Sequence, residues 1–172
     1  MNADEMSRYI TGTFEGVDVV DGEETSGNSF FFYNPDLTVP PDHNFPIMTI
    51  VTSDAYDQFS NLDRPSVFRL NIGISKETFR SLFGKPKLPS DRENEAESVD
   101  NNSGDGTYDF TVLDQVMPHP VYGRMYWVCV LSPSDDTFET KVRPLLDEAY
   151  KMAVSKYDRQ AARKREKSQS PA

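Results

Sequence analysis

The clearest alternation of apolar and polar positions lies between residues 67 and 74. Such a two-residue period is typical of a strand with one buried face. The apolar side comprises Phe68, Leu70, Ile72 and Ile74, and the other side comprises Arg69, Asn71 and Gly73. The alternation therefore predicts a strand that separates core side chains from a second, more polar face.

A short helix is predicted directly after this strand. Ser75 is a good N-cap, because its hydroxyl can accept a hydrogen bond from the first turn. Phe79, Leu82 and Phe83 recur at helical spacing and form an apolar stripe. Gly84 then favours helix termination.

The remaining segments complete an α+β fold. Helical spacing predicts a first helix over residues 3–14 and a last helix that starts near Pro144, with residues 138–142 as a preceding turn. Further strands are predicted at residues 17–20, 30–33, 47–52 and 126–131. This order predicts a mostly antiparallel sheet with helices packed on one face.

The polar segments set the predicted domain boundaries. We expect one α+β domain over residues 1–157, interrupted by a disordered acidic insertion at about residues 87–107, which has almost no apolar side chains. Residues 158–172 form a charged tail, either a frayed helix or disordered. Its basic tract at residues 163–165 is typical of a nuclear signal, an anion contact or a solvated helix end.

Charge and composition narrow the class of protein. A formal net charge of −10 and a pI of about 4.6 disfavour nucleic acid as the default partner. The single cysteine, Cys129, cannot form an internal disulfide and lies in a predicted apolar strand. No signal peptide and no apolar run of membrane-spanning length is evident. We expect a cytoplasmic protein without membrane contact. For the basic tract we favour a solvated helix end, and a nuclear location is the alternative that it leaves open.

Six sequence blocks carry a resemblance to a known family. They are FFFYNPD (residues 30–36), SNLDRP (60–65), FRLNIG (68–73), LFG (82–84), PHPVYG (118–123) and WVCVLSPS (127–134). Together they resemble a family of small bacterial and fungal proteins classed as a domain of unknown function, over most of residues 5–157. A more distant similarity to MmcQ/YjbR-like proteins implies a compact α+β fold and, by analogy only, nucleic-acid binding.

The segment Pro118-His119-Pro120 supplies the catalytic candidates. Two prolines hold His119 on a stiff, extended backbone, and an imidazole titrates near neutral pH. His119 would act as general acid or base and Tyr122 as a hydrogen-bond donor, with Asp109 or Asp114 orienting the imidazole. The alternative, which we favour, is structural: His119 caps a loop and Tyr122 covers the edge of the sheet.

The polar face of the strand at residues 67–74 supplies the ligand-binding candidates. Arg69 and Asn71 share that face, and Trp127 on the last strand is expected beside them. Such a face could bind a small anion or a polar ring. The alternative is a structural network in which Arg69 pairs with Asp57 or Asp63.

No cofactor or metal is expected. The two histidines, His43 and His119, are isolated, and no zinc, calcium, phosphate-loop or dinucleotide motif occurs. The sequence favours a binding module for a small molecule or a protein on the sheet face. An enzyme that uses His119 is the alternative, and nucleic-acid binding is a third interpretation that the net charge disfavours. The oligomeric state stays open.

Overall fold

The architecture comes from a computed structural model that describes residues 1–37, 44–85 and 108–169. The elements are α1 (Ala3–Thr13), β1 (Val17–Val20), η1 (Glu23–Thr25), β2 (Ser29–Tyr33), β3 (Met48–Val51), β4 (Arg69–Gly73), α2 (Lys76–Phe83), β5 (Met117–Pro118), η4 (Gly123–Met125), β6 (Trp127–Leu131), α3 (Asp135–Thr137), η5 (Phe138–Val142) and α4 (Arg143–Gln169). The six strands form one antiparallel sheet in the order β1-β2-β3-β4-β6-β5. The predicted α+β class is confirmed. His43 and the expected acidic insertion lie outside the described residues.

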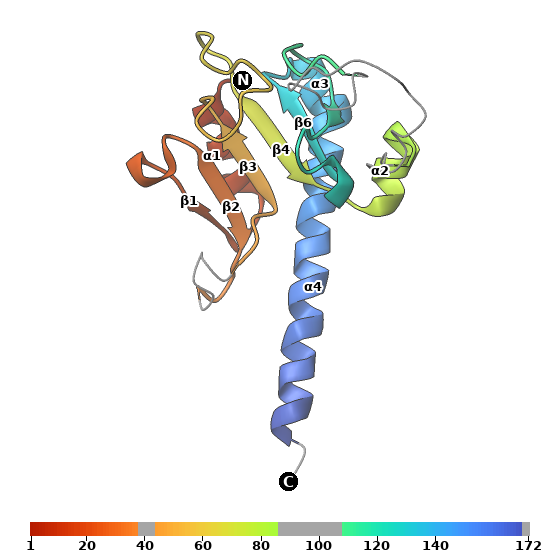
Figure 1. Cartoon of the computed structure of the whole chain (residues 1–172). Coiled ribbons are helices and arrows are strands. Elements are labelled where there is room, and N and C mark those ends of the chain that lie inside the picture. Colours follow the sequence, from red (N-terminus) through yellow and green to blue (C-terminus); the bar gives the residue numbers. More distant parts are fainter. Residues whose placement is uncertain (38–43, 86–107, 170–172) are drawn as a thin grey trace.

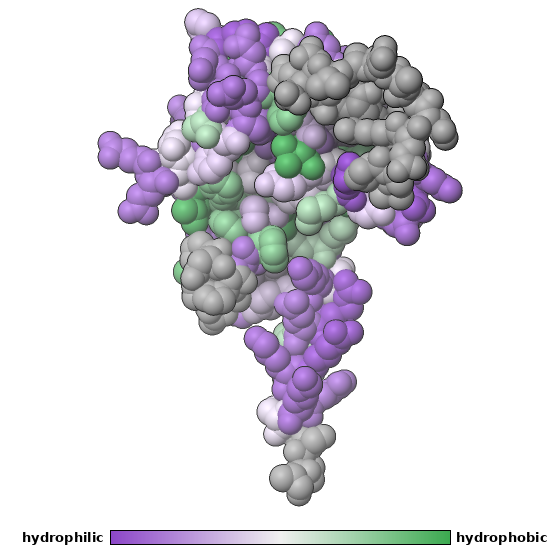
Figure 2. Space-filling model, viewed as in Figure 1, coloured by the Kyte–Doolittle hydropathy of each residue, from purple (hydrophilic) through white to green (hydrophobic). Residues whose placement is uncertain are grey.

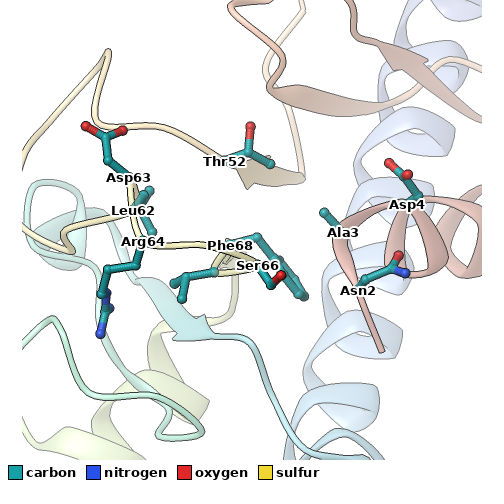
Figure 3. Close-up of a pocket in the computed structure, with 10 residues that line it drawn as sticks. Asn2, Ala3, Asp4, Thr52, Leu62, Asp63, Arg64, Ser66 and Phe68 are labelled. Carbon is teal, nitrogen blue, oxygen red and sulfur yellow. The ribbon is translucent and has the colours of Figure 1, made fainter.

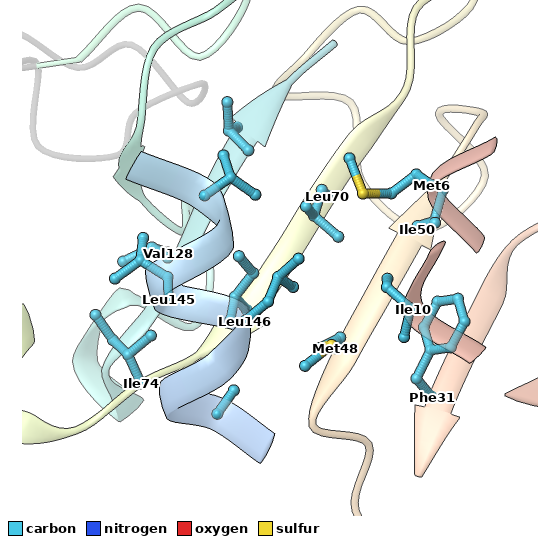
Figure 4. Packing of buried hydrophobic residues seen from close by; sticks show 14 of the residues in the cluster. Met6, Ile10, Phe31, Met48, Ile50, Leu70, Ile74, Val128, Leu145 and Leu146 are labelled. Atoms are coloured by element: carbon cyan, nitrogen blue, oxygen red, sulfur yellow. The ribbon is translucent and has the colours of Figure 1, made fainter. Parts of the chain in front are cut away.

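Helices α1 and α4 cover one face of the sheet. Met6 and Ile10 of α1 and Leu146 of α4 are fully buried against strand residues such as Met48 and Leu70. Figure 4 shows these side chains meeting between the two helices and the strands. Burying each such aliphatic side chain contributes about 1.5–3 kcal/mol, so this interface supplies much of the stability.

The opposite face of the sheet is covered by loops rather than by helices. Leu62 and Phe110 project from the segments before β4 and before β5, and they pack on Cys129 and Leu131 of β6 in a second apolar cluster. Arg64 joins the two segments, because its Nη2 donates to the carbonyls of Ser60 (3.1 Å) and Thr111 (2.9 Å). The predicted polar face of β4 is therefore buried.

The strand–helix unit β4–α2 forms as predicted, with one correction. The Ser75 hydroxyl accepts from the Thr78 amide, and Gly84 ends α2 at a φ of 80°. Phe79 is buried and Phe83 packs against the core, but Leu82 is half-exposed. The predicted three-residue stripe is wrong at Leu82, because only Phe79 and Phe83 pack against the core from α2, which lies at the side of the sheet in Figure 1.

The last helix projects far beyond the sheet. The predicted turn at residues 138–142 is the π-helical η5, and α4 continues from Arg143 to Gln169. Figure 1 shows α4 crossing the sheet and leaving the body toward the C-terminus. Tyr150 donates to the Glu15 carbonyl (2.8 Å) and Tyr157 donates to Asp36, which ties the middle of the helix to the body.

Among the described residues no helix is long and apolar enough to span a membrane.

Candidate functional site

Arg69 forms a buried ion pair on the loop-covered face of the sheet. Its side chain is 1% exposed; Nη1 donates to Asp57 Oδ1 (2.9 Å) and Nη2 to Asp57 Oδ2 (2.5 Å). Nη1 also donates to the Ser60 hydroxyl (2.8 Å). Burial by itself raises the pKa of the Asp57 carboxyl, but the hydrogen bond and charge of Arg69 outweigh burial and hold that pKa below its ordinary value. Of the two predicted partners of Arg69, Asp57 is the one that forms the pair.

Asn71 lies two residues along the same face and is also buried. Its Nδ2 donates to the Thr49 hydroxyl (2.9 Å) on the neighbouring strand. Asn71 Oδ1 and Arg69 Nε have no hydrogen-bond partner within the part of the chain that the structure describes. Both atoms are closed off from bulk solvent, so a ligand on this face would first have to displace the covering loop.

His119 is engaged by the backbone of its own turn. The side chain is 5% exposed, and Nδ1 accepts from the amides of Val121 (3.1 Å) and Tyr122 (3.0 Å). Burial, helped by the positive charge of Arg69, lowers the pKa of His119 to about 3. The imidazole is therefore neutral at physiological pH, and its accepting nitrogen is already used.

The predicted orienting carboxylates lie elsewhere. Asp109 accepts from the amide and the hydroxyl of Thr111, and Asp114 accepts from the Ser134 amide (2.6 Å). Tyr122 is half-exposed, with its ring centroid 5.0 Å from that of His119. These contacts favour the structural alternative for His119 and leave Tyr122 as a surface ring that covers it.

Trp127 borders a large groove at the end of the sheet. The groove has a volume of about 880 Å³ and lies between α4, the segment before β3, and the junctions at the end of β4 and the start of β6. Its apolar wall includes Phe45, Met125 and Met152, which are 77%, 62% and 41% exposed. Figure 2 shows apolar surface on the body close to where the hydrophilic α4 emerges. We call this feature the Trp127 groove.

Gly73 allows Trp127 to lie against β4. A Cβ built on Gly73 would be 3.2 Å from Cε2 and Cζ2 of the indole, closer than most side-chain contacts. Gly73 and Trp127 are opposite each other in the β4–β6 register. The absence of a side chain at residue 73 thus positions the indole at the groove.

Substituting Gly73 with alanine should displace the indole. We expect Gly73→Ala to destabilise the fold by about 1–2 kcal/mol through overpacking and to shift the emission maximum of Trp127. Urea unfolding and steady-state fluorescence measure the two effects, because Trp127 is the single tryptophan of the chain. Gly12→Ala is the matched control: its added Cβ meets nothing within 4 Å. An unchanged emission maximum and unfolding midpoint in Gly73→Ala would contradict this account.

A second hollow is smaller, and two of its polar side chains, Asn2 and Arg64, are already partnered. It has a volume of about 510 Å³ between the start of α1 and the loop at residues 62–68, as Figure 3 shows. Asn2 caps α1 through the Glu5 amide, and Arg64 donates to three backbone carbonyls. This hollow brings together none of the candidates that the sequence suggested.

Sequence reasoning identified Trp127 but missed the other apolar residues of the groove. Phe45, Met125 and Met152 occur in a loop, a turn and a helix that are far apart in the chain. A single exposed apolar residue is common on protein surfaces and carries no signal by itself. Only their convergence in space makes them notable. Among the described residues, no group of three or more metal-ligating side chains converges in this way.

Comparison with other proteins gives a family but no close relative of known structure. No curated protein and no solved structure matches the chain. The distant similarity to MmcQ/YjbR-like proteins therefore stays a prediction. A family model does match nearly the whole chain, residues 1–162, and includes all the groove residues discussed above. The chain belongs to the family of unknown function DUF6194.

Proposed function

We propose that this protein is a non-catalytic binding module that holds a segment of a partner protein in the Trp127 groove. The observation that carries the proposal is the convergence of Phe45, Met125 and Met152 around a partly exposed indole. Large exposed apolar side chains that gather in one place mark interaction sites far more often than scattered ones do. In this proposal the binding site lies at the end of the sheet, and not on the buried polar face of β4 where the sequence suggested it.

The residue types at the groove suit recognition of a polypeptide. Aromatic side chains and methionine are enriched at protein interfaces, and flexible thioethers adapt to different apolar partners. The Trp127 indole N–H has no acceptor in the described part of the chain, so it is free to donate to a backbone carbonyl of a bound segment. The groove is also open along α4, which gives room for an extended or helical segment.

The states of the titratable candidates support binding rather than catalysis. His119 is neutral and buried, and the Asp57 carboxylate is paired with Arg69. Burial raises the pKa of the Cys129 thiol to about 12, so this residue is a poor nucleophile. We retain the cytoplasm as the compartment in this proposal, since a buried free thiol suits a reducing environment.

A peptide selection tests the proposal. Peptides from a random phage-displayed library that bind the protein should change Trp127 fluorescence on titration, because the indole lies at the groove. We expect Phe45→Ser and Met125→Ser each to weaken binding about tenfold, as apolar anchors of an interface do.

The matched control for this test is Leu82→Ser, which removes a half-exposed apolar side chain of α2 outside the groove. Its affinity for the selected peptides should stay within about twofold of wild type. The proposal fails if no selected peptide depends on the groove residues, or if the Leu82 and Phe45 variants lose affinity equally.

A further inference from the structure

We propose that the segment bound in the Trp127 groove is acidic at one end, and that its carboxylates pair with a row of cations along the projecting part of α4. This inference rests on the proposed function and adds the chemistry and the direction of the partner. The row consists of Lys156, Arg159, Arg163 and Lys167, which we call the basic stripe.

The basic stripe continues the wall of the groove. Its members are spaced by three, four and four residues, which places them on one face of a helix. Met152, four residues before Lys156, lies on the same face, and Met152, Lys156 and Arg159 all line the groove. The stripe then runs for about 16 Å along α4, at 1.5 Å per residue. A bound segment that leaves the groove along α4 would therefore meet these cations in turn.

The cations of the stripe are unpaired within the described chain. None of the four forms a salt bridge there, and the one hydrogen bond is from Arg159 Nε to the Ser155 carbonyl of the same helix (3.1 Å). The guanidinium groups of Arg69 and Arg143, in contrast, are held by carboxylates. The stripe thus presents charge that no described carboxylate neutralises.

The helix dipole does not explain the stripe. Cations stabilise a helix C-terminus, but the effect falls off within the last turn. Since α4 ends at Gln169, Lys167 lies in that turn, whereas Arg159 and Lys156 lie ten or more residues before the end. Arg163 also lies before the last turn, so three of the four cations need another reason, and two of these three, Lys156 and Arg159, line the groove.

The projecting part of α4 also lacks support from the body. Beyond Arg159 no hydrogen bond or ion pair joins the helix to the body among the described residues. A short helix that is polar on all sides is marginal in water by itself. A partner that neutralises its cations would stabilise it.

The groove favours a polypeptide over a nucleic acid. The groove offers apolar anchors, for which a phosphate backbone has no counterpart: Phe45, Met125 and Met152. At the body end of the groove, the carboxylates of Asp147 and Glu148 repel phosphates. The chain as a whole is strongly acidic. The predicted partner therefore has apolar side chains toward the body and carboxylates toward the C-terminus of α4.

Charge reversal along the stripe tests the inference. The probes are the library peptides that bind wild type, with a DNA duplex of mixed sequence as a second probe. We expect selected peptides to be acidic at one end, to bind more weakly as salt rises, and to lose about tenfold or more affinity to the variant Lys156→Glu, Arg159→Glu, Arg163→Glu, Lys167→Glu.

The matched control reverses four exposed cations elsewhere, Arg8, Lys76, Arg80 and Lys141, to the same net charge. It should change peptide affinity by less than about threefold, because it alters only the long-range field.

The outcomes separate this inference from the proposed function. Peptides that need Phe45 but are neutral or basic, or that bind the stripe variant unchanged, would overturn the inference and leave the groove as a binding site. The absence of any groove-dependent peptide would remove both. Duplex DNA that binds wild type but not the stripe variant, with no acidic peptide doing so, would assign the stripe to nucleic acid and overturn the inference.

Discussion

Replacing Asp57 with alanine is expected to destabilise the fold by about 3–5 kcal/mol, because it leaves the Arg69 guanidinium buried without a counter-charge. Arg69 is 1% exposed and its two Nη atoms donate to Asp57. A surface ion pair would be worth far less, since water solvates its charges when the pair is broken. Here the covering loop prevents that solvation unless it opens.

Urea unfolding measures this loss, and two variants serve as controls. Asp63→Ala removes the other aspartate that the sequence offered to Arg69, and we expect a cost below about 1 kcal/mol, because Asp63 makes no salt bridge in the described chain. The double variant Asp57→Ala, Arg69→Met should recover much of the lost stability, since no charge remains buried. Equal costs for Asp57→Ala and Asp63→Ala would refute this role of the pair.

The free energy of unfolding is expected to fall by roughly 3–5 kcal/mol as the pH decreases from about 6.5 to about 3, owing to His119. The folded state holds His119 neutral with a pKa of about 3, whereas an unfolded histidine titrates near 6.5. Between these values the unfolded state binds more protons, so acid favours unfolding. The contribution is fully present above about pH 6.5 and is lost as the pH falls through this range.

The variant His119→Asn isolates this effect. An asparagine oxygen can still accept from the amides of Val121 and Tyr122 but does not titrate. Urea unfolding is compared for two proteins, each carrying His43→Gln to remove the second histidine. The protein that retains His119 should show a clear slope of stability between about pH 4.5 and 6.5, and the His119→Asn variant should give a nearly flat line.

The titration of Asp57 does not contribute to the slope of stability measured between about pH 4.5 and 6.5. Because its folded pKa is lowered, its contribution is present above the ordinary aspartate range and is lost only below about pH 4. The slope above pH 4.5 therefore reports the histidine. The same slope in the presence and absence of His119 would show that the buried imidazole does not control acid stability.

Much of the fold could be predicted from sequence because its signals are local. The alternation around Arg69 and Leu70 separated the two faces of β4, and Ser75 and Gly84 placed the ends of α2. Leu82 shows the limit of such signals. Helical spacing describes which side chains share a face, but the width of the interface with the rest of the protein decides how many of them are buried.

The candidate site was less predictable because it depends on contacts between distant segments. The sequence singled out Arg69, His119 and Trp127, but it did not distinguish a ligand-binding arginine from one held by Asp57. Nor did it show whether His119 faces solvent or its own turn. Burial and hydrogen-bond partners decide both questions. Neither can be predicted from the residues that are adjacent in sequence, because both depend on contacts between distant segments.

By itself the sequence determined the local elements, the acidic character and the positions of the unusual residues, since capping, alternation and charge depend on nearby residues or on composition alone. Tertiary structure decided that the polar face of β4 lies under a loop and that the exposed apolar groove, which we propose as the binding site, lies beside Trp127. That groove exists because Phe45, Met125 and α4 converge there although they are far apart along the chain. Convergence of this kind follows from packing the whole sheet against α4, which no local pattern encodes.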